Sequence, residues 1–366
     1  MVEWKKLGDI CEVQRGKRLT KNLLDDKAAY PVYHGGLDPL GRYGQYNREA
    51  NTVMVINVGA SAGTVGFCNC RFWSSDGCFC ISHSELLDNK YLFYYLQTKT
   101  HYLQSQVRHA GIPTLDNPIV EKIMLPLLSL SEQQRIVEQL DTFTSSIENL
   151  KEQIAQRRKQ YEYYRDQLLD LEGKPGVEWF ELLELCDYVD YRGKTPSKVD
   201  AGIFLVTAKN IRKGYIDYDN SKEYISEGDY EEVMHRGKPQ IGDVLVTTEA
   251  PLGNVAQIDN ENIALAQRVI KYRPKDERLN SSYLKYILLG SEFQIRLEKE
   301  ATGATAKGIK GSKLHRMQIP LPPLSEQQRI VSILDTFEAS VANLEQQLAL
   351  REKQYEYYRN KLLTFE

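Results

Sequence analysis

The sequence has no long hydrophobic run. Its first residues, MVEWKKLGDI, lack the apolar core of a secretory signal, and no stretch approaches the ~20 apolar residues that a membrane-spanning helix needs. The chain therefore carries no recognisable signal for secretion or membrane insertion. We expect a cytoplasmic protein.

The sequence also lacks a strong net charge, which is -3 from 47 basic and 50 acidic side chains. This balance excludes a uniformly basic nucleic-acid binder, but it conceals two basic islands. Arg192–Lys213 holds six basic residues against Asp200 alone, and Ala301–Arg316 holds four Lys and Arg residues with no acid. Islands of this kind suit contacts with nucleic-acid phosphates, and solvated loops are the alternative.

Sequence motifs of several enzyme classes are missing. The chain has no NPPY or DPPY motif of adenine methylation, no FxGxG loop for S-adenosylmethionine, no P-loop and no HExxH motif. The glycine-rich segment from Gly59 to Gly66 lacks the Lys-Ser/Thr ending of a phosphate loop and is predicted to be a turn. We therefore predict a chain without a catalytic site, and an enzyme with dispersed active-site residues is the alternative.

Cysteine is scarce, with six residues. Cys68 and Cys70, followed by Cys78 and Cys80, could hold zinc, but the pairs are separated by one residue instead of the usual two and lie in strand-like segments. Alternating residues of a strand share one face, where a free cysteine acts as a small hydrophobe. We predict no metal site, with zinc as the alternative, and a core position for Cys11 and Cys186.

An internal repeat organises the chain. Leu130–Leu169 aligns without a gap on Leu324–Leu363, and 27 of the 40 paired positions are identical. An earlier repeat relates VEWKKLGDIC at Val2 to VEWFELLELC at Val177. Each half thus runs from a VEW opening through a variable domain and a proline-containing strand into a helix that begins near SEQQ.

The repeat sets the predicted domain limits. Two variable domains occupy residues 1–129 and 177–323, two repeat helices occupy residues 130–172 and 324–366, and residues 173–176 form a linker. Short strand-like segments, glycine-rich turns and one or two helices in each variable domain predict an α+β, or mixed α/β, fold.

The repeat helices carry a heptad pattern. Apolar residues recur every three or four positions from Ile136 to Leu171 and from Ile330 to Phe365, with interruptions at Arg157 and Arg351. Ser131 and Ser325 are predicted as N-caps. Two such helices in one chain most simply form an antiparallel coiled coil, and 40 residues at 1.5 Å each make a spacer of about 60 Å.

Residues off the heptad seam are also identical in the two copies. Two identical surfaces suit two copies of one partner, whereas a recent duplication is the alternative. The predicted partner-binding residues are Glu132, Gln133, Gln134, Arg135, Lys159, Gln160, Glu162, Arg165, Glu326, Gln327, Gln328, Arg329, Lys353, Gln354, Glu356 and Arg359.

The whole chain resembles the DNA specificity subunit of type I restriction-modification systems. The resemblance rests on the segments PLLSLSEQQRIV and IPLPPLSEQQRIV, each placed between a variable domain and a long helix. It implies two target recognition domains that each read one half of a bipartite DNA site, and helices that set the gap and dock two methyltransferase subunits. The first copy departs from the family pattern, since Leu128 and Ser129 replace the prolines seen at Pro322 and Pro323.

The resemblance further implies partners that supply the chemistry. Restriction subunits would join the assembly as an ATP-dependent nuclease, and S-adenosylmethionine, ATP and Mg²⁺ would bind those partner subunits, with no cofactor on this chain. Methyltransferases on two equivalent faces would modify adenines on opposite strands. Half-sites closer than ~18 base pairs, and about one helical turn apart, would fit the spacer.

Polar residues of loops are the candidate contacts to double-stranded DNA. Arg and Lys reach phosphates or guanine edges, Asn pairs with adenine, and aromatic rings can stack on bases or pack the loop. The candidates are Arg15, Lys17, Arg18, His34, Arg42, Tyr43, Gln45, Tyr46, Asn47, Arg108, His109, Arg192, Lys194, Thr195, Lys209, Asn210, Arg212, Lys307, Lys310 and Lys313.

Two other functions fit the same sequence pattern. The chain could serve a fused methyltransferase-nuclease instead of separate subunits, or it could be a scaffold whose variable domains bind proteins. A steep salt dependence of DNA binding would separate the recognition hypothesis from the scaffold.

Overall fold

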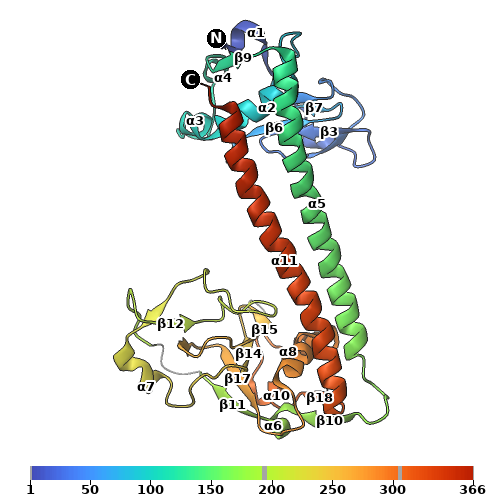
Figure 1. Ribbon diagram of the computed structural model, residues 1–366, viewed down its shortest axis with the longest axis vertical. Helices are drawn as coiled ribbons and strands as arrows, with labels where there is room; N and C mark the ends of the chain where they lie inside the picture. The colour runs from blue at the N-terminus through green and yellow to red at the C-terminus, as the bar shows by residue number, and fades with distance from the viewer. Residues whose placement is uncertain (1, 192–195, 304–306, 366) are drawn as a thin grey trace. The chain divides into compact units, whose positions relative to one another are not determined.

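The computed structural model describes residues 2–191, 196–303 and 307–365 (Figure 1). The chain divides into two compact units, which are Met1–Glu152 with Glu345–Glu366, and Gln153–Leu344. Among the described residues, no helix is both long and apolar enough to cross a membrane.

Two 40-residue helices dominate the structure, α5 (Leu130–Leu169) and α11 (Leu324–Leu363). Each helix contributes one part to each unit. Helix α5 begins three residues after strand β9 (Met124–Leu127), and α11 begins three residues after β18 (Gln318–Leu321). The change from Pro-Pro to Leu-Ser in the first copy therefore leaves the length of the strand-helix junction unaltered.

The predicted N-caps are wrong by two residues. The carbonyl of Ser129 accepts hydrogen bonds from the amides of Glu132 and Gln133, both at 3.0 Å, and the carbonyl of Pro323 accepts the equivalent pair in the second copy. Main-chain carbonyls thus close the first turn of each helix. Ser131 and Ser325 lie inside the helices.

The first unit contains three sheets. Strand β1 (Glu3–Lys6) pairs with β9 in a two-stranded antiparallel sheet. The four-stranded sheet has the order β2-β8-β5-β6, and the three-stranded sheet has the order β4-β3-β7 with β3 and β7 parallel. The strands are β2 (Val13–Arg15), β3 (Tyr30–Tyr33), β4 (Gly41–Tyr43), β5 (Thr52–Ile56), β6 (Val65–Cys68), β7 (Trp73–Ser74) and β8 (Cys78–Ile81), and the helices are α1 (Leu7–Ile10), α2 (Asn89–Thr98), α3 (Thr100–Ser105) and α4 (Asn117–Glu121), with a 3-10 turn η1 (Lys21–Leu23).

The second unit repeats this topology strand for strand. Its sheets have the orders β10-β18, β11-β17-β14-β15 and β13-β12-β16, and β12 and β16 are again parallel. The strands are β10 (Glu178–Glu181), β11 (Cys186–Asp190), β12 (Ile203–Val206), β13 (Tyr224–Ile225), β14 (Val244–Thr248), β15 (Leu252–Gln257), β16 (Ile263–Leu265) and β17 (Val269–Pro274), and the helices are α6 (Leu182–Leu185), α7 (Tyr230–Val233), α8 (Ser281–Leu289), α9 (Ser291–Glu300) and α10 (Gly311–Leu314), with a 3-10 turn η2 (Glu227–Asp229). The prediction of a mixed α/β fold built from a two-domain repeat is confirmed.

Each unit packs the start of one long helix and the end of the other into its core. In the first unit, Ile136 and Leu140 of α5 join Leu363 of α11 in one hydrophobic cluster. In the second unit, Ile330 and Leu334 of α11 cluster with the end of α5. Burial of these side chains, worth about 1.5–3 kcal/mol each, ties the helices to both units.

The helix segments within each unit run antiparallel. In the first unit, the ring of Phe143 stacks on Tyr358 at 5.2 Å, and Lys151 pairs with Glu352 at 3.2 Å, so that numbers rise along α5 as they fall along α11. In the second unit, Tyr164 stacks on Phe337 at 5.4 Å. The arginines that interrupt the heptads, Arg351 and Arg157, lie over the same two phenylalanines, both at 5.8 Å.

Candidate nucleic-acid interface

Two predicted DNA-binding residues of the first unit meet at Asp76. The Arg15 Nε donates to the Asp76 carbonyl at 3.1 Å, and the His34 Nδ1 lies 3.3 Å from the Asp76 carboxylate. Lys17 and Arg18 follow β2 directly, and both are exposed. Asp76 therefore contacts Arg15 through its main-chain carbonyl and His34 through its carboxylate, and the exposed Lys17 and Arg18 lie close by in the chain.

The loop that carries Arg108 and His109 is fastened to the turn after β5. The amide of Leu115 donates to the Asn57 carbonyl at 2.9 Å, and the amide of Gly59 donates to the Pro113 carbonyl at 2.9 Å. The Arg108 guanidinium pairs with Asp116 at 2.8 Å, and His109 is exposed. Main-chain bonds thus fix this loop at the end of strand β5.

Glycine permits a close approach between two of these segments. A Cβ atom on Gly77 would lie 2.7 Å from the amide nitrogen of Gly35 and 2.7 Å from the ring of His34. Any larger residue at Gly77 would push away the loop that carries His34. The turn of residues 75–77 therefore holds His34 and Arg15 on one side of the unit.

The loop from Arg42 to Asn47 is mostly engaged with its own unit. The Arg42 guanidinium donates to the carbonyls of Ala28 and Ala29. Tyr43 packs edge-on against Trp73, and Tyr46 packs against Tyr30 and beneath Arg71. The two tyrosines therefore fill the packing role that the sequence left as an alternative, and Gln45 is exposed.

Asn47 needs a correction. Its Oδ1 accepts from the Ser74 amide at 2.7 Å, and its Nδ2 donates to the Ser74 carbonyl at 3.0 Å. Both ends of the carboxamide are thus bound to β7. We reassign Asn47 from a base contact to a residue that holds its loop against the sheet.

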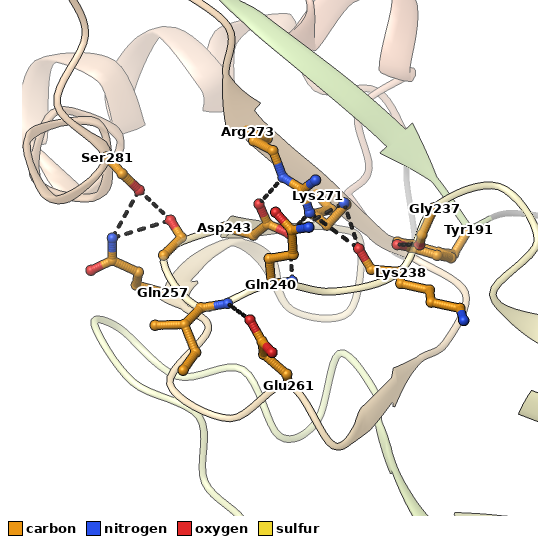
Figure 2. A network of polar contacts seen from close by, with 12 residues as sticks. Tyr191, Gly237, Lys238, Gln240, Asp243, Gln257, Glu261, Lys271, Arg273 and Ser281 are labelled. Carbon is orange, nitrogen blue, oxygen red and sulfur yellow. Dashed lines mark hydrogen bonds and ion pairs between the residues drawn. The ribbon is translucent and has the colours of Figure 1, made fainter. Parts of the chain in front are cut away.

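Three predicted contacts of the second unit, Arg192, Lys194 and Thr195, lie outside the described residues. The residue before them is well anchored, since the Tyr191 hydroxyl donates to the Gly237 carbonyl at 2.6 Å. That anchor belongs to a polar network around the buried Asp243, which is 2% exposed (Figure 2).

Asp243 receives two cations from one strand. Its carboxylate lies 3.2 Å from the Nζ of Lys271, and it accepts from the Arg273 guanidinium at 2.6 and 2.7 Å. Lys271 also donates to the Lys238 carbonyl at 3.1 Å. Burial lowers the pKa of Lys271, and the neighbouring carboxylate opposes that shift. The network fastens the segment before β14 to β17, close to Tyr191.

The prediction for Asn210 is wrong. Its side chain is fully buried, and its Oδ1 accepts from the Thr207 amide and hydroxyl at 3.0 and 2.8 Å while its Nδ2 donates to the Asp217 carbonyl at 3.0 Å. No atom of this carboxamide can reach a base edge. Asn210 instead shapes a loop on which Lys209 is exposed and Arg212 pairs with Asp217 at 3.3 Å.

The second basic island is attached in the way that the Arg108 loop is attached in the first unit. Thr302 and Gly308 exchange two main-chain hydrogen bonds of 2.9 Å, and the amide of Ile309 donates to the Thr248 carbonyl at the end of β14. Lys307 and Lys310 are exposed. The third predicted lysine, Lys313, pairs with Glu300 at 2.9 Å.

Two of the predicted partner-binding residues are buried and structural. Gln133 and Gln327 are both 0% exposed. The Gln133 side chain donates to the carbonyls of Leu86 and Leu128 and accepts from the amide of Asp88, the N-cap of α2. Gln327 makes the same three bonds in the second unit. Their assignment to a partner surface is therefore wrong, because both amides are consumed in docking the long helix.

Other repeated residues remain on the surface. Glu132 pairs with Arg135 at 2.6 Å and Glu326 with Arg329 at 2.7 Å, and hydrogen bonds from these arginines lower the pKa of both glutamates. Seven other predicted partner-binding residues are exposed and make no side-chain hydrogen bond or ion pair within the described chain. They are Gln134, Lys159, Gln160, Glu162, Gln328, Lys353 and Glu356.

Three repeated residues near the helix ends contact their own unit. The side chain of Arg165 is 13% exposed and donates to Ser291 at 3.1 Å. Arg359 lies over the ring of Tyr355 at 5.4 Å, and Gln354 accepts from Arg351 at 3.1 Å. These three side chains are half-buried and contact α9 or their own helix, and their assignment to a partner surface stays a prediction.

The cysteines form small buried side chains except for Cys70. Cys11, Cys68, Cys78, Cys80 and Cys186 are at most 5% exposed. Burial raises the pKa of Cys11 and Cys68 to about 11 and that of Cys78 and Cys186 to about 12. In the part of the chain that the structure describes, no three His, Cys, Asp or Glu side chains form a group that could hold a metal ion.

Asp76 and Arg268 were missed by the sequence predictions. Asp76 orients Arg15 and His34, and Arg268 lies beside the anchored basic loop of the second unit, paired with Glu249 at 2.9 Å. Neither residue belongs to a basic island or to a motif. Only the folded chain brings them to the sites that they help to build.

Comparison with known proteins identifies a family and several relatives that this chain resembles. Residues 1–157 and 176–351 match a family described as the type I restriction modification DNA specificity domain. The chain is 32% identical to the specificity subunit of the type I restriction enzyme EcoR124I/EcoR124II of Escherichia coli, over 78% of this chain and 72% of that protein.

Two further likenesses extend over most of the chain. Identity is 26% with the specificity subunit of the type I restriction enzyme MjaVIII of Methanocaldococcus jannaschii, over 86% of this chain and 78% of the relative. The fold is similar to the crystal structure of a type I restriction-modification S subunit from M. genitalium, with a TM-score of 0.64, 17% identity, and coverage of 100% and 97% of the two chains.

Proposed function

The chain belongs to the family of type I restriction-modification DNA specificity subunits, and we propose that it reads a bipartite DNA site with one recognition domain per half-site. The observation that carries this proposal is the duplicated topology. Two units have the same three sheets in the same strand order, yet their exposed loops carry different side chains. One scaffold with two sets of loops is what recognition of two unlike half-sites requires.

The recognition domains in this proposal are residues 1–129 and 177–323, and the repeat helices beyond each of them form the spacer. Basic side chains at strand ends, such as Arg15 and Lys17 in the first domain and Lys307 and Lys310 in the second, supply phosphate contacts in the major groove. The helices set the distance between half-sites.

The exposed repeated residues of α5 and α11 give each methyltransferase subunit an equivalent docking surface. The surface consists of the Glu132–Arg135 and Glu326–Arg329 pairs with their exposed neighbours, such as Gln134 and Gln328. Two equivalent surfaces support two methyltransferase subunits, which would modify adenines on opposite strands. Restriction subunits would complete the assembly.

The chain itself supplies recognition and assembly in this proposal, without a catalytic step. S-adenosylmethionine would bind the methyltransferase subunits, and ATP and Mg²⁺ would bind the other partner subunits. The matching family is one of specificity subunits, which is consistent with this division of labour.

Methylome sequencing tests the proposal. The chain is expressed together with its cognate methyltransferase in a host that lacks other adenine methylation, and modified positions are mapped. We expect two short fixed sequences separated by a gap of unspecified bases, with one modified adenine on each strand. Methylation without a fixed sequence, or at a single undivided site, would contradict the bipartite mechanism.

A salt series separates DNA recognition from a protein scaffold. Affinity of the reconstituted complex for DNA should fall steeply with salt, because phosphate contacts release counterions. Changing Lys307 and Lys310 to Ala should weaken binding to every sequence and reduce the slope of log K against log salt by about 2. A flat salt response of the unaltered complex would rule against phosphate contacts.

A further inference from the structure

Arg268 has an unusual backbone conformation. It lies between β16 and β17 with a φ of 70°, in the left-handed region that strains a non-glycine residue. The conformation is held from β14, since the amide and hydroxyl of Thr248 both donate to the Arg268 carbonyl, at 2.9 and 3.3 Å. The chain thus keeps a large charged residue where glycine would be unstrained.

A carboxylate holds the Arg268 side chain in place. Its Nε lies 2.9 Å from the Glu249 Oε1, and the two side chains are 54% and 44% exposed. An arginine that is held at Nε keeps its planar guanidinium in one orientation, and the terminal amino groups of that plane are suited to two parallel hydrogen bonds. The Arg268–Glu249 pair is therefore oriented before any ligand arrives.

The pair lies against the basic loop of the second unit. Glu249 forms a β-bridge with Gly308, and a Cβ atom on Gly308 would lie 3.2 Å from the Glu249 Cβ. Ile309 donates to the carbonyl of Thr248, one residue before Glu249. The exposed Lys307 adjoins this bridge. An oriented guanidinium and a flexible cation are thus brought to one place.

The two cations suit different parts of DNA. A lysine on a loop binds phosphate as a point charge, whereas a guanidinium with a fixed plane matches O6 and N7 of guanine in the major groove. Backbone strain clusters at ligand-binding sites, which supports a binding role for this exposed charged residue.

We propose that Arg268 reads a guanine in the half-site bound by residues 177–323, with Glu249 as the residue that positions it. This inference rests on the proposed function and adds one base to it. The recognised base is identified by its edge, which offers two acceptors to one guanidinium.

The test uses the full chain reconstituted with its methyltransferase and a DNA library in which the second half-site is randomised. The unaltered complex should select guanine at one position. Arg268→Gly should lower that preference on the order of 5- to 150-fold and leave every other position unchanged. Because glycine tolerates a φ of 70°, the melting temperature of the chain should be unchanged or higher. A structural role for Arg268 would lower it.

Two further variants sharpen the result. Glu249→Gln should reduce the guanine preference in part, since the neutral amide holds the guanidinium more weakly. Arg278→Lys is the matched control, because Arg278 is 56% exposed and paired with Asp276 at 2.8 Å in the same unit. The control should leave the selected sequence unaltered.

The outcomes are distinct. A second half-site without guanine, or an unchanged preference in Arg268→Gly, overturns the assignment while bipartite recognition stands. Equal weakening at all sequences makes Arg268 a phosphate contact and also overturns it. Absence of any sequence preference in the unaltered complex overturns the proposed function itself.

Discussion

Identical residues in two copies of a repeat can be identical for an internal reason. Gln133 and Gln327 are the clearest case, since each amide bonds to three main-chain groups of its own unit. Each joins the start of a long helix to the N-cap of α2 or α8. The neighbouring Gln134 and Gln328 are equally repeated but exposed. Sequence identity alone cannot separate an internal constraint from a partner constraint, because both preserve the same residue.

Replacing the buried glutamine should destabilise the chain. Gln327→Ala removes the side-chain partner of the Asn280 amide and of the Arg278 and Pro322 carbonyls, and a group left unsatisfied away from water costs about 1–3 kcal/mol. We expect a loss of roughly 2–4 kcal/mol in the free energy of unfolding, measured by urea titration. Gln328→Ala is the control and should change it by less than about 0.5 kcal/mol. Equal effects of the two changes would show that the bonds of Gln327 contribute nothing.

Burial should also make the five buried cysteines less reactive toward alkylating reagents than the exposed Cys70. The pKa values of about 11 to 12 mean that on the order of one buried thiol in a thousand, or fewer, is ionised at pH 8. We expect iodoacetamide to label Cys70 in the native chain and all six cysteines in urea, as measured by mass spectrometry. Rapid labelling of Cys78 in the native chain would contradict its burial. Because these pKa values are raised on folding, stability should fall as the pH rises above about 9.

At the scale of elements, the sequence predicted the order of segments along the chain better than it predicted which strands pair. The repeat predicted the order of each half, which is a VEW opening, a variable domain, a proline-containing strand and a long helix. The two variable domains share little sequence, yet every strand of the first unit has a counterpart in the second. Pairing, register and the parallel β3–β7 and β12–β16 contacts depend on residues far apart in the chain. No local pattern reveals them.

The ion pairs of the buried Asp243 join the segment before β14 to β17, and a substitution can test how much they stabilise the second unit. Asp243 precedes β14, and Lys271 and Arg273 belong to β17 (Figure 2). Asp243→Asn leaves the buried Lys271 without its countercharge, and breaking such a pair costs about 3–5 kcal/mol. We expect early urea unfolding of the second unit, monitored by hydrogen exchange in β14 and β17.

The control for this change removes both buried charges. In the double variant Asp243→Asn, Lys271→Met, position 271 carries no charge that needs a partner, and the loss should be smaller than in Asp243→Asn alone. The single variant Lys271→Met completes the comparison. If the stability loss of the double variant equals the sum of the losses in Asp243→Asn and Lys271→Met, the two residues do not interact. Exchange rates in the first unit serve as an internal reference.

At the scale of the whole molecule, the two long helices determine how the units are built. The first unit is not a continuous segment of the chain, because it contains the end of α11, and the second unit, which is continuous, begins with the end of α5. The sequence predicted the two helices and their antiparallel pairing from the heptad pattern. It could not predict that helix ends enter the domain cores, because Leu363 and Leu169 lie next to heptad positions in the sequence and carry no separate signal.

The boundary between the units provides a direct test of the spacer proposal. A heptad inserted between Glu152 and Gln153 of α5, and another between Leu344 and Glu345 of α11, would leave the hydrophobic clusters of both units intact. Seven residues preserve the heptad register and add about 10.5 Å, or about three base pairs at 3.4 Å each. We expect the gap in the methylated site to grow by about three base pairs while both half-sites stay the same.

Two comparisons make this result interpretable. A four-residue insertion in both helices breaks the heptad phase and should reduce methylation instead of giving a new regular gap. An insertion in α5 alone lengthens one helix of an antiparallel pair and should do the same. If the doubly extended chain methylates the original site with the original gap, the helices do not measure the distance between half-sites, and the recognition domains must be positioned by the partner subunits.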